Sequence, residues 1–260
     1  MILSFTKYHG TGNDFIMIDS TKNADFSLSN EQISFLCDRR FGIGADGVII
    51  IFRHKEYDFE MRYHNADGSM SFCGNGARCA VKFAQSLALF DSTARFIAID
   101  GEHLATLDGD LISLKMNDVK NYSLNEDHYV IDTGSPHYIQ FTKDLAKEDI
   151  VKFGKEVRYS PTYKTVGINV NLVEVSSDNK LKMLTYERGV EDETYSCGTG
   201  ATAVALAYGD TMNLTKINVD IQVKGGMLKV KALRKGKDFE AIYLIGPAVA
   251  VFQGEIQLPA

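Results

Sequence analysis

The feature that most constrains this sequence is a short motif that occurs twice. Residues Cys73–Ala77 read Cys-Gly-Asn-Gly-Ala, and residues Cys197–Ala201 read Cys-Gly-Thr-Gly-Ala. The two copies stand about half of the 260-residue chain apart, and Gly12 and Gly42 find looser matches in the second half at nearly the same offset. A repeat this long, in two copies, indicates two homologous halves and not a solenoid, which needs more and shorter units.

The pattern of apolar residues predicts more strands than helices, with one central apolar helix in each half. In the first half, helices are expected at 30–39, with Ser29 as N-cap, and at 77–89. Strands are expected there at 2–7, 15–19, 47–52, 58–63, 96–99, 104–107 and 111–116. In the second half a helix is expected at 201–208, with strands at 129–132, 138–141, 166–175, 182–186, 217–223, 228–232 and 239–245.

This order predicts an α/β (α+β) fold of two pseudo-symmetric domains, each a curved, mostly antiparallel sheet wrapped around a central helix. The polar, weakly patterned stretch 113–127 is the expected boundary. The expected domains are therefore 1–118, which contains Cys73, and 119–260, which contains Cys197, with the C-terminal residues able to return to the first half.

Composition excludes several classes of function. The net charge of −6 gives no basic footprint for nucleic acid or an anionic membrane. Neither a run of about 18 apolar residues nor a signal peptide is recognisable, so no membrane association is expected. Four cysteines without a Cys-x-x-Cys pair indicate a reduced, cytoplasmic protein, in which Cys37 and Cys79 are expected to be small core residues. No ligand spacing indicates a metal site.

The two Cys-Gly-x-Gly loops are the strongest candidates for chemistry. A cysteine just before an apolar helix lies where backbone N–H groups point outward, which favours the thiolate. Neighbouring glycines allow close approach of a ligand, and the same N–H groups can bind a carboxylate. One such cysteine is more often packing, but two at equivalent positions of duplicated halves, Cys73 and Cys197, favour function.

Two thiols suit the inversion of an α-carbon, which needs a base on one face and an acid on the other. Without an electron-sink cofactor, the carbanion must be stabilised by helix termini acting on the carboxylate in a dry site. No pyridoxal-phosphate lysine motif and no phosphate-binding loop are recognisable. The expected protein is therefore a cofactor-independent amino-acid racemase or epimerase.

Six motifs, taken together, resemble the diaminopimelate epimerase family. They are the stretches 5–15 (containing His-Gly-Thr-Gly-Asn-Asp-Phe), 40–47 (Arg-Phe-Gly-Ile-Gly-Ala-Asp-Gly), 65–69 (Asn-Ala-Asp-Gly-Ser), 73–79, 187–189 (Glu-Arg-Gly) and 197–200. The resemblance implies two α/β domains with the active site in the cleft between them. It also implies interconversion of LL- and meso-2,6-diaminopimelate in lysine and cell-wall precursor biosynthesis, by a homodimer.

The resemblance also implies roles for individual residues. Cys73 and Cys197 are the acid/base pair, and His137 and Glu187 assist proton transfer behind them. The reacting carboxylate would lie at the two helix starts. The residues implied there are Gly74, Asn75, Gly198 and Thr199. The distal amino-acid end of the substrate would bind Asn13, Asn65, Asn169, Glu187 and Arg188, whose guanidinium fork suits a carboxylate.

Some of these residues have plainer interpretations. Asn65 is also a typical turn residue, Glu187 and Arg188 could form a surface ion pair, and His9 could be a core histidine. This chain also departs from the family at three places. Ser135 replaces an asparagine, Gly47 replaces a glutamine found in some members, and the acidic stretch 191–193 replaces a glycine-containing loop.

Three alternative functions remain open. A proline or hydroxyproline racemase shares the two-thiol logic but has no need of polar groups at a distal amino-acid end, such as Asn13 and Asn65. An isomerase of a ring or aromatic acid with a single acid/base carboxylate is disfavoured by the two cysteines. A redox-responsive binding protein would use Cys73 and Cys197 as a switchable disulfide, which is compatible with an oxidation-sensitive enzyme.

Overall fold

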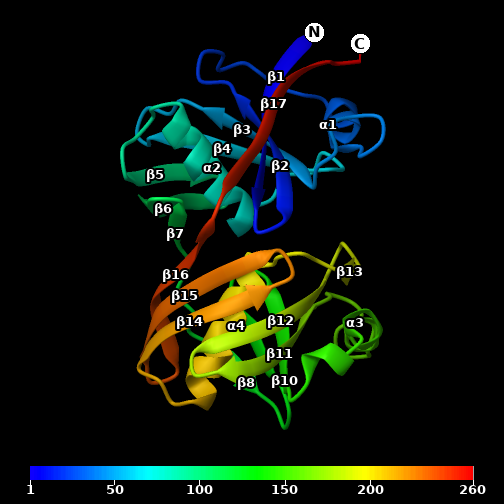
Figure 1. Cartoon of the computed structure of the whole chain (residues 1–260), viewed down its shortest axis with the longest axis vertical. Helices are drawn as coiled ribbons and strands as arrows, with labels where there is room; N and C mark the ends of the chain where they lie inside the picture. Colours follow the sequence, from blue (N-terminus) through cyan, green and yellow to red (C-terminus); the bar gives the residue numbers. More distant parts are fainter. Residues whose placement is uncertain (260) are drawn as a thin grey trace. The chain divides into compact units, whose positions relative to one another are not determined.

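A computed structural model describes residues 1–259, which form two compact units (Figure 1). The first unit comprises Met1–Leu114 together with the C-terminal segment from Gly246, and the second unit comprises Lys115–Ile245. That these units are duplicated domains, divided at 118/119, stays a prediction.

The first unit is a mixed sheet with two helices. Its strand order is β17-β1-β2-β3-β4-β5-β6-β7, parallel at the β2–β3 and β4–β5 pairs and otherwise antiparallel. Figure 1 shows the last strand, in red, beside the first, in blue. The elements are β1 (Ile2–Gly10), β2 (Asn13–Asp19), α1 (Asn30–Cys37), β3 (Gly47–Phe52), β4 (Phe59–Asn65), α2 (Gly74–Ser86), β5 (Thr93–Ala98), β6 (Gly101–Asp108), β7 (Leu111–Lys115) and β17 (Val249–Gln257).

The second unit has the strand order β8-β9-β10-β11-β12-β14-β15-β16, parallel at β10–β11 and β12–β14 and otherwise antiparallel. A two-residue strand, β13 (Asp192–Glu193), pairs with β12. The other elements are β8 (Tyr122–Leu124), β9 (Tyr129–Asp132), β10 (Pro136–Thr142), η1 (Leu145–Lys147), α3 (Ile150–Arg158), β11 (Asn169–Ser177), β12 (Lys180–Glu187), α4 (Gly198–Thr211), β14 (Lys216–Val223), β15 (Gly226–Lys235) and β16 (Asp238–Pro247).

The two units share one topology. The two parallel strand pairs fall at the same two places in each strand order. Helices α1 and α3 come before the second strand of the first parallel pair, β3 or β11. Helices α2 and α4 come before the second strand of the other parallel pair, β5 or β14. The expected α+β class, with two pseudo-symmetric halves that are mostly antiparallel sheet, is confirmed.

A buried central helix organises the core of each unit. Helix α2 contacts strands β1 to β4 and β6, and α4 contacts β9, β10, β11, β14 and β15. Within α4, the residues from Gly200 to Gly209 are all buried. Small residues, mostly alanine, glycine and threonine, let the strands approach the helix from several sides. The sheet can therefore curve around it.

The second helix of each unit covers the outer face of the sheet. Ile33 and Leu36 of α1 join a cluster with Ile16, Val48 and Ile50 from β2 and β3. All six residues of β3 are buried, which explains why its sequence, Gly-Val-Ile-Ile-Ile-Phe, is apolar without alternation. Helix α3 has the same place in the second unit, where Ile150 packs with Val170 and Leu172 of β11.

Several element boundaries differ from the expectation. The N-cap at Ser29 is confirmed, with a capping box to Gln32, but α1 ends at Cys37 because the chain turns at Asp38. Helix α2 begins at Gly74 and not at residue 77, and α4 begins at Gly198 and not at residue 201. Strand β17 was not expected. No helix in residues 1–259 is long and apolar enough to cross a membrane.

Candidate active site

Cys73 and Cys197 have the same local structure in their own units. Each is the N-cap residue of a central helix, with φ and ψ of −133° and 117° at Cys73 and −123° and 109° at Cys197. The Cys73 carbonyl accepts from Ala77 N at 2.7 Å and the Cys197 carbonyl from Ala201 N at 2.9 Å. Each thiol therefore lies at the positive end of a helix dipole, as the repeated motif predicts. The predicted carboxylate-binding residues, Gly74 and Asn75 or Gly198 and Thr199, form the first turn of each helix.

In the first unit, Asn13 contacts the Cys73 thiol. Its Oδ1 accepts from Cys73 Sγ at 3.5 Å and from Asn75 Nδ2 at 3.2 Å, while its Nδ2 donates to Asp46 Oδ2 at 2.5 Å. Gly76 N donates to Cys73 Sγ at 3.5 Å. Three predicted site residues, Asn13, Cys73 and Asn75, are thus brought together.

A buried arginine supports this group from within the core. Arg78 of α2 is fully buried and donates to Asn75 Oδ1 at 3.0 Å and to Thr11 Oγ1 at 3.1 Å. Burial lowers the pKa of Arg78. Because a buried guanidinium needs its hydrogen bonds satisfied, Asn75 is held in one orientation.

Behind Asn13 lies a network of charges. Asp14 forms ion pairs with Lys7 Nζ at 2.7 Å and with Arg39 at 2.8 Å, and Arg39 also binds Asp46 at 2.8 Å. Lys7, which is buried, also donates to the carbonyl of Gly44. The network connects β1, β2 and the loop before β3, so it fixes the backbone around Asn13.

In the second unit a chain of hydrogen bonds leads to Cys197. Thr185 Oγ1 donates to Asn171 Oδ1 at 3.0 Å, and Asn171 Nδ2 lies 3.1 Å from His137 Nδ1. His137 Nε2 lies 2.9 Å from Thr199 Oγ1, which in turn lies 3.5 Å from Cys197 Sγ. His137, Cys197 and Thr199, all predicted site residues, are therefore connected.

His137 is neutral in this environment. Burial, helped by the charge of Arg188, lowers the pKa of His137 to about 3. Gly200 leaves room for the chain, because a Cβ there would lie 2.8 Å from Asn171 Oδ1 and 3.2 Å from His137 Cε1. The second glycine of this Cys-Gly-x-Gly motif is thus a packing requirement as well.

Asn169 is hydrogen-bonded both to Arg188 and to Ser135, the residue just before β10. Asn169 Nδ2 donates to Ser135 Oγ at 2.8 Å and to Pro136 O at 3.2 Å, and its Oδ1 accepts from Arg188 N at 2.9 Å. The Pro136 carbonyl and the Arg188 N–H therefore orient the Asn169 amide, and Ser135, one of the departures from the family, accepts a further hydrogen bond from it. The Arg188 guanidinium donates to Val166 O at 3.1 Å.

Asn65 lies in a turn at the end of β4. Its Nδ2 donates to Ser69 O at 3.1 Å and to Ser71 Oγ at 3.1 Å, so Asn65 stabilises this turn. Gly47 pairs directly with Asn65 across β3 and β4. A Cβ on Gly47 would lie 2.4 Å from the His64 carbonyl oxygen, so this chain has no room there for the glutamine of other members.

The acidic residues after Arg188 form hydrogen bonds and an ion pair that hold their own loop. Glu191 has a positive φ of 60°, and its carboxylate accepts from Tyr186 Oη at 2.8 Å, Tyr159 Oη at 3.0 Å and Gly189 N at 3.2 Å. Glu193 pairs with Lys224 at 2.7 Å. These acids therefore hold the loop shape. Glu187, at the start of this loop, is half-buried at the end of β12.

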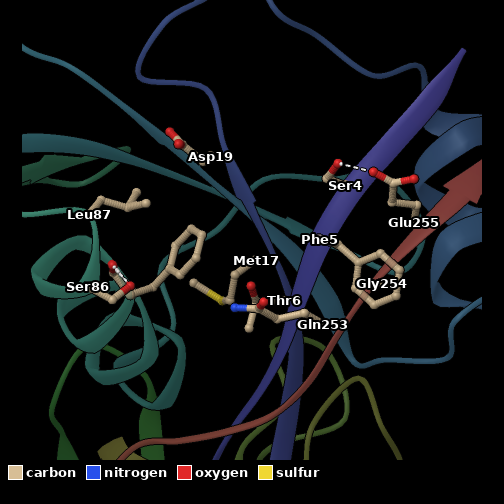
Figure 2. Close-up of a pocket in the computed structure, with 11 residues that line it drawn as sticks. Ser4, Phe5, Thr6, Met17, Asp19, Ser86, Leu87, Gln253, Gly254 and Glu255 are labelled. Carbon is tan, nitrogen blue, oxygen red and sulfur yellow. Dashed lines mark hydrogen bonds between the residues drawn. The ribbon is translucent and has the colours of Figure 1, made fainter.

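The groove in Figure 2 belongs to the first unit but contains no predicted site residue. It is lined by residues of β1, β2 and β17 and by Phe83, Ser86 and Leu87 at the C-terminal end of α2. Cys73 is at the other end of this 13-residue helix, about 20 Å away at 1.5 Å per residue. The groove is therefore separate from the candidate site.

Sequence reasoning missed the residues that orient the others, namely Asp46, Arg78, Asn171 and Thr185. Two signals were available. Asp46 belongs to the Gly-Ala-Asp-Gly motif, and Asn171 follows Asn169 by two residues, which places both on one face of a strand. Cys37 and Cys79 are buried as expected, and burial raises the pKa of Cys37 to about 12 and raises that of Cys79 as well.

The fold is shared with several solved structures. A phenazine biosynthesis protein of the PhzF family from Bacillus anthracis has a TM-score of 0.77 at 13% identity, covering 99% of this chain and 100% of that one. A probable proline racemase from Agrobacterium radiobacter has a TM-score of 0.69 at 15% identity, covering 100% and 93%. At such low identity these similarities show the fold alone.

Similarity in sequence identifies the family. The family model "Diaminopimelate epimerase" matches residues 5–114 and 129–251. A diaminopimelate epimerase from Flavobacterium psychrophilum is 46% identical over 252 residues, covering 96% of this chain and 98% of the relative. This chain belongs to the diaminopimelate epimerase family.

Proposed function

We propose that this protein interconverts LL- and meso-2,6-diaminopimelate by moving a proton between the α-carbon and two thiols, without a cofactor. The observation that carries the proposal is the pair of N-cap cysteines at matched positions of two units with one topology, in a chain of this family. The activity makes the protein an isomerase of lysine and cell-wall precursor biosynthesis, working in the cytoplasm.

The reaction requires both thiols to reach one α-carbon from opposite faces. One, as thiolate, takes the α-proton and becomes S–H. The other gives its proton to the carbanion and becomes the thiolate. The developing charge on the carboxylate is stabilised by the helix starts at Gly74–Asn75 and Gly198–Thr199, where the dipole is positive. His137 and Glu187 are proposed to support this transfer.

The non-reacting amino-acid end of the substrate is proposed to bind Asn13, Asn65, Asn169, Glu187 and Arg188. Two of these amides are already oriented by the protein, Asn13 by Asp46 and Asn169 by the Pro136 carbonyl and the Arg188 N–H. Such orientation lowers the entropy lost on binding. A proline racemase would have no use for these polar residues. Diaminopimelate is therefore the substrate that we propose.

We also propose that the protein is a homodimer joined along β17. This strand pairs with β1 on one side, and within residues 1–259 no strand of the first unit pairs with its other edge. Val249, Val251 and Phe252 on it are 44%, 55% and 48% exposed. An exposed apolar edge strand is a typical site of pairing between chains.

The direct test is incubation of the reduced protein with LL-diaminopimelate in D2O. Inversion should produce the meso isomer, with one deuterium at the inverted carbon, because the delivered proton comes from a thiol that exchanges with solvent. Activity should require a reducing agent. Absence of inversion under reducing conditions would reject the proposed function.

A further inference from the structure

We propose that His103 positions the Cys73 thiol by holding the ring of Phe72, the residue from which the chain enters the N-cap of helix α2. His103 is a positioning residue, because it acts on the chain that carries the thiol and not on the substrate. The inference rests on the proposed function for its catalytic meaning. It adds to that function a side chain of strand β6 that fixes where the helix, and with it the thiol, begins.

Aromatic rings form a continuous column in the first unit. Its inner members are Phe59 of β4, Phe96 of β5 and His103 of β6, and the successive ring centroids lie 4.8 Å and 5.2 Å apart. Phe90 stacks on one end of the column, with its centroid 6.3 Å from that of Phe59. Phe72 stacks on the other end, with its centroid 4.1 Å from that of His103. The column therefore ends on the residue immediately before the thiol.

The register of three strands places the inner rings in line. Phe59 is paired with Phe96 across the parallel strands β4 and β5, and Phe96 is paired with His103 across the antiparallel strands β5 and β6. Directly paired residues point to the same face of a sheet, so these three side chains stack. Phe59 and Phe96 are completely buried. The column on which Phe72 rests is therefore part of the packed core.

Asp100 fixes the orientation of the His103 ring. Its carboxylate only accepts hydrogen bonds, so His103 Nε2, which lies 2.8 Å from Asp100 Oδ1, is the donor. The His103 side chain is only 10% exposed, and the planes of its ring and the Phe72 ring differ by 2°. A ring that is packed on one face and hydrogen-bonded at its edge presents a fixed flat surface on the other face. Phe72 lies on that surface.

The chain just before Phe72 is held by a different set of bonds. The Asn65 amide donates to Ser69 O and to Ser71 Oγ, and Asn65 N donates to Ser69 O at 2.8 Å. These bonds hold the turn after β4 as far as Ser71. Within residues 1–259 the backbone of Phe72 forms no hydrogen bond. Its ring contact with His103 therefore ties it to the sheet.

The place of Phe72 determines the first turn of α2. The Cys73 carbonyl accepts from Ala77 N at 2.7 Å, and Cys73 Sγ accepts from Gly76 N at 3.5 Å. Both bonds need the extended N-cap conformation of Cys73, and this requires the chain to arrive from the direction of Phe72. Displacement of a reacting group by about 1 Å can slow a reaction by about 10²-fold. Holding Phe72 therefore holds the thiol where it can serve the reaction.

The two sets of bonds predict different kinetic effects. Asn65 is proposed to bind the distal end of the substrate, and its bonds to Ser69 and Ser71 do not involve His103. Loss of the ring contact should therefore leave substrate binding almost unchanged and slow the proton transfer at Cys73. The expected result is a fall in kcat with little change in KM.

Substitutions at the two ends of the column give a matched test. Phe72→Leu and Phe90→Leu each remove one end ring and keep an apolar side chain, at positions that are both half-buried. Inversion of LL-diaminopimelate is measured with the reduced, full-length protein. Phe72→Leu should lower kcat about tenfold and change KM by less than about twofold. Phe90→Leu should leave both constants within about twofold, because it weakens packing only at the far end of the column.

Amide hydrogen exchange without substrate measures the positioning itself. The N–H of Ala77, which is bonded to the Cys73 carbonyl, should exchange about tenfold faster in Phe72→Leu than in the unmodified protein. Ala201 N makes the equivalent bond at the start of α4 and is the internal reference, so its exchange should not change. Phe90→Leu should leave the exchange of both amides unchanged.

Two variants of His103 separate its ring from its hydrogen bond. His103→Leu removes the flat surface and should reproduce the kinetic and exchange effects of Phe72→Leu. His103→Phe keeps the surface but loses the bond to Asp100, so it should recover kcat to within about threefold of the unmodified protein. Equal losses in the two His103 variants would overturn the role of the ring contact.

A normal kcat in Phe72→Leu, or an equal fall in Phe90→Leu, would overturn the inference, as would a rise in KM at constant kcat. These outcomes decide the matter even if the His103 variants do not fold. They are also separable from the proposed function. A protein that shows the exchange effects but does not invert diaminopimelate fails only as that enzyme, and one that inverts diaminopimelate equally well as Phe72→Leu fails only here.

Discussion

Asp14 shows how a single residue stabilises the site without belonging to it. Burial raises the pKa of this carboxyl, but hydrogen bonds from Arg39 and Lys7, with the charges of both cations, outweigh burial and lower the pKa to about 2. Its side chain is 19% exposed, so solvent screens these pairs only in part. The folded state therefore binds a proton at Asp14 less readily than the unfolded chain does.

This pKa shift predicts loss of stability in acid. Since the folded pKa is below the unfolded value of about 4, the stabilisation is present above that pH and is lost as the pH falls towards 2. The contribution is on the order of 2 kcal/mol. In urea unfolding, the Asp14→Asn variant should have a lower free energy of unfolding at pH 7 than the unmodified protein. Its free energy of unfolding should depend less on pH between about 5 and 2. Asp91→Asn, at an exposed position, should keep the normal dependence. Parallel curves for Asp14→Asn and the unmodified protein would contradict the shift.

Glu191 illustrates what sequence alone could not give at this scale. The acidic stretch after Arg188 could be recognised as a departure from the family, but not its consequence. The carboxylate is tied to Tyr186 and Tyr159, and Tyr159 follows α3, 32 residues earlier. Only the folded chain brings these partners together. Asn171 is similar, because its two hydrogen-bond partners in the chain to Cys197, His137 and Thr185, come from neighbouring strands.

At the scale of elements, those with a local sequence signal could be predicted, and those that depend on pairing with a distant part of the chain could not. The N-cap at Ser29 carries a side chain that is typical of helix starts, and it was placed correctly. Cys73 and Cys197 are unusual N-caps followed by two glycines with poor helix propensity, so both helices were predicted to begin three residues late. Strand β17 was missed because it has no alternation of buried and exposed residues and exists by pairing with β1, at the other end of the sequence.

The same strand gives a prediction for assembly. Replacing Phe252 with glutamate puts a charge on the outer edge of β17, where the ring is 48% exposed, and should dissociate the proposed dimer. Light scattering after size-exclusion chromatography measures the change in mass. Phe41→Glu, at a ring that is 81% exposed in the loop after α1, is the control and should leave the dimer intact. A monomeric unmodified protein, or a dimeric Phe252→Glu variant, would contradict the assignment of this edge.

At the scale of the whole molecule, the two units share one topology and each has an N-cap thiol, but the surroundings of the two thiols differ. The strand order and both helix positions repeat from one unit to the other, and so do the N-cap cysteines. The repeated motif was sufficient to predict this much. The side chains around each thiol do not repeat, since Cys73 contacts Asn13 and Cys197 contacts Thr199. That asymmetry suits a reaction in which the two groups begin in opposite protonation states.

The central claim is that each thiol serves one face of the α-carbon. The measurement that tests it most directly is α-deuterium exchange in D2O by Cys73→Ala and Cys197→Ala, with LL- and meso-diaminopimelate supplied separately. Inversion should fall by about 10²- to 10⁴-fold in both variants, while Cys79→Ala keeps it. Each cysteine variant should still exchange the α-hydrogen of one isomer, and the two variants should differ in which one. Retained inversion in either variant, or exchange of the same isomer by both, would contradict the account.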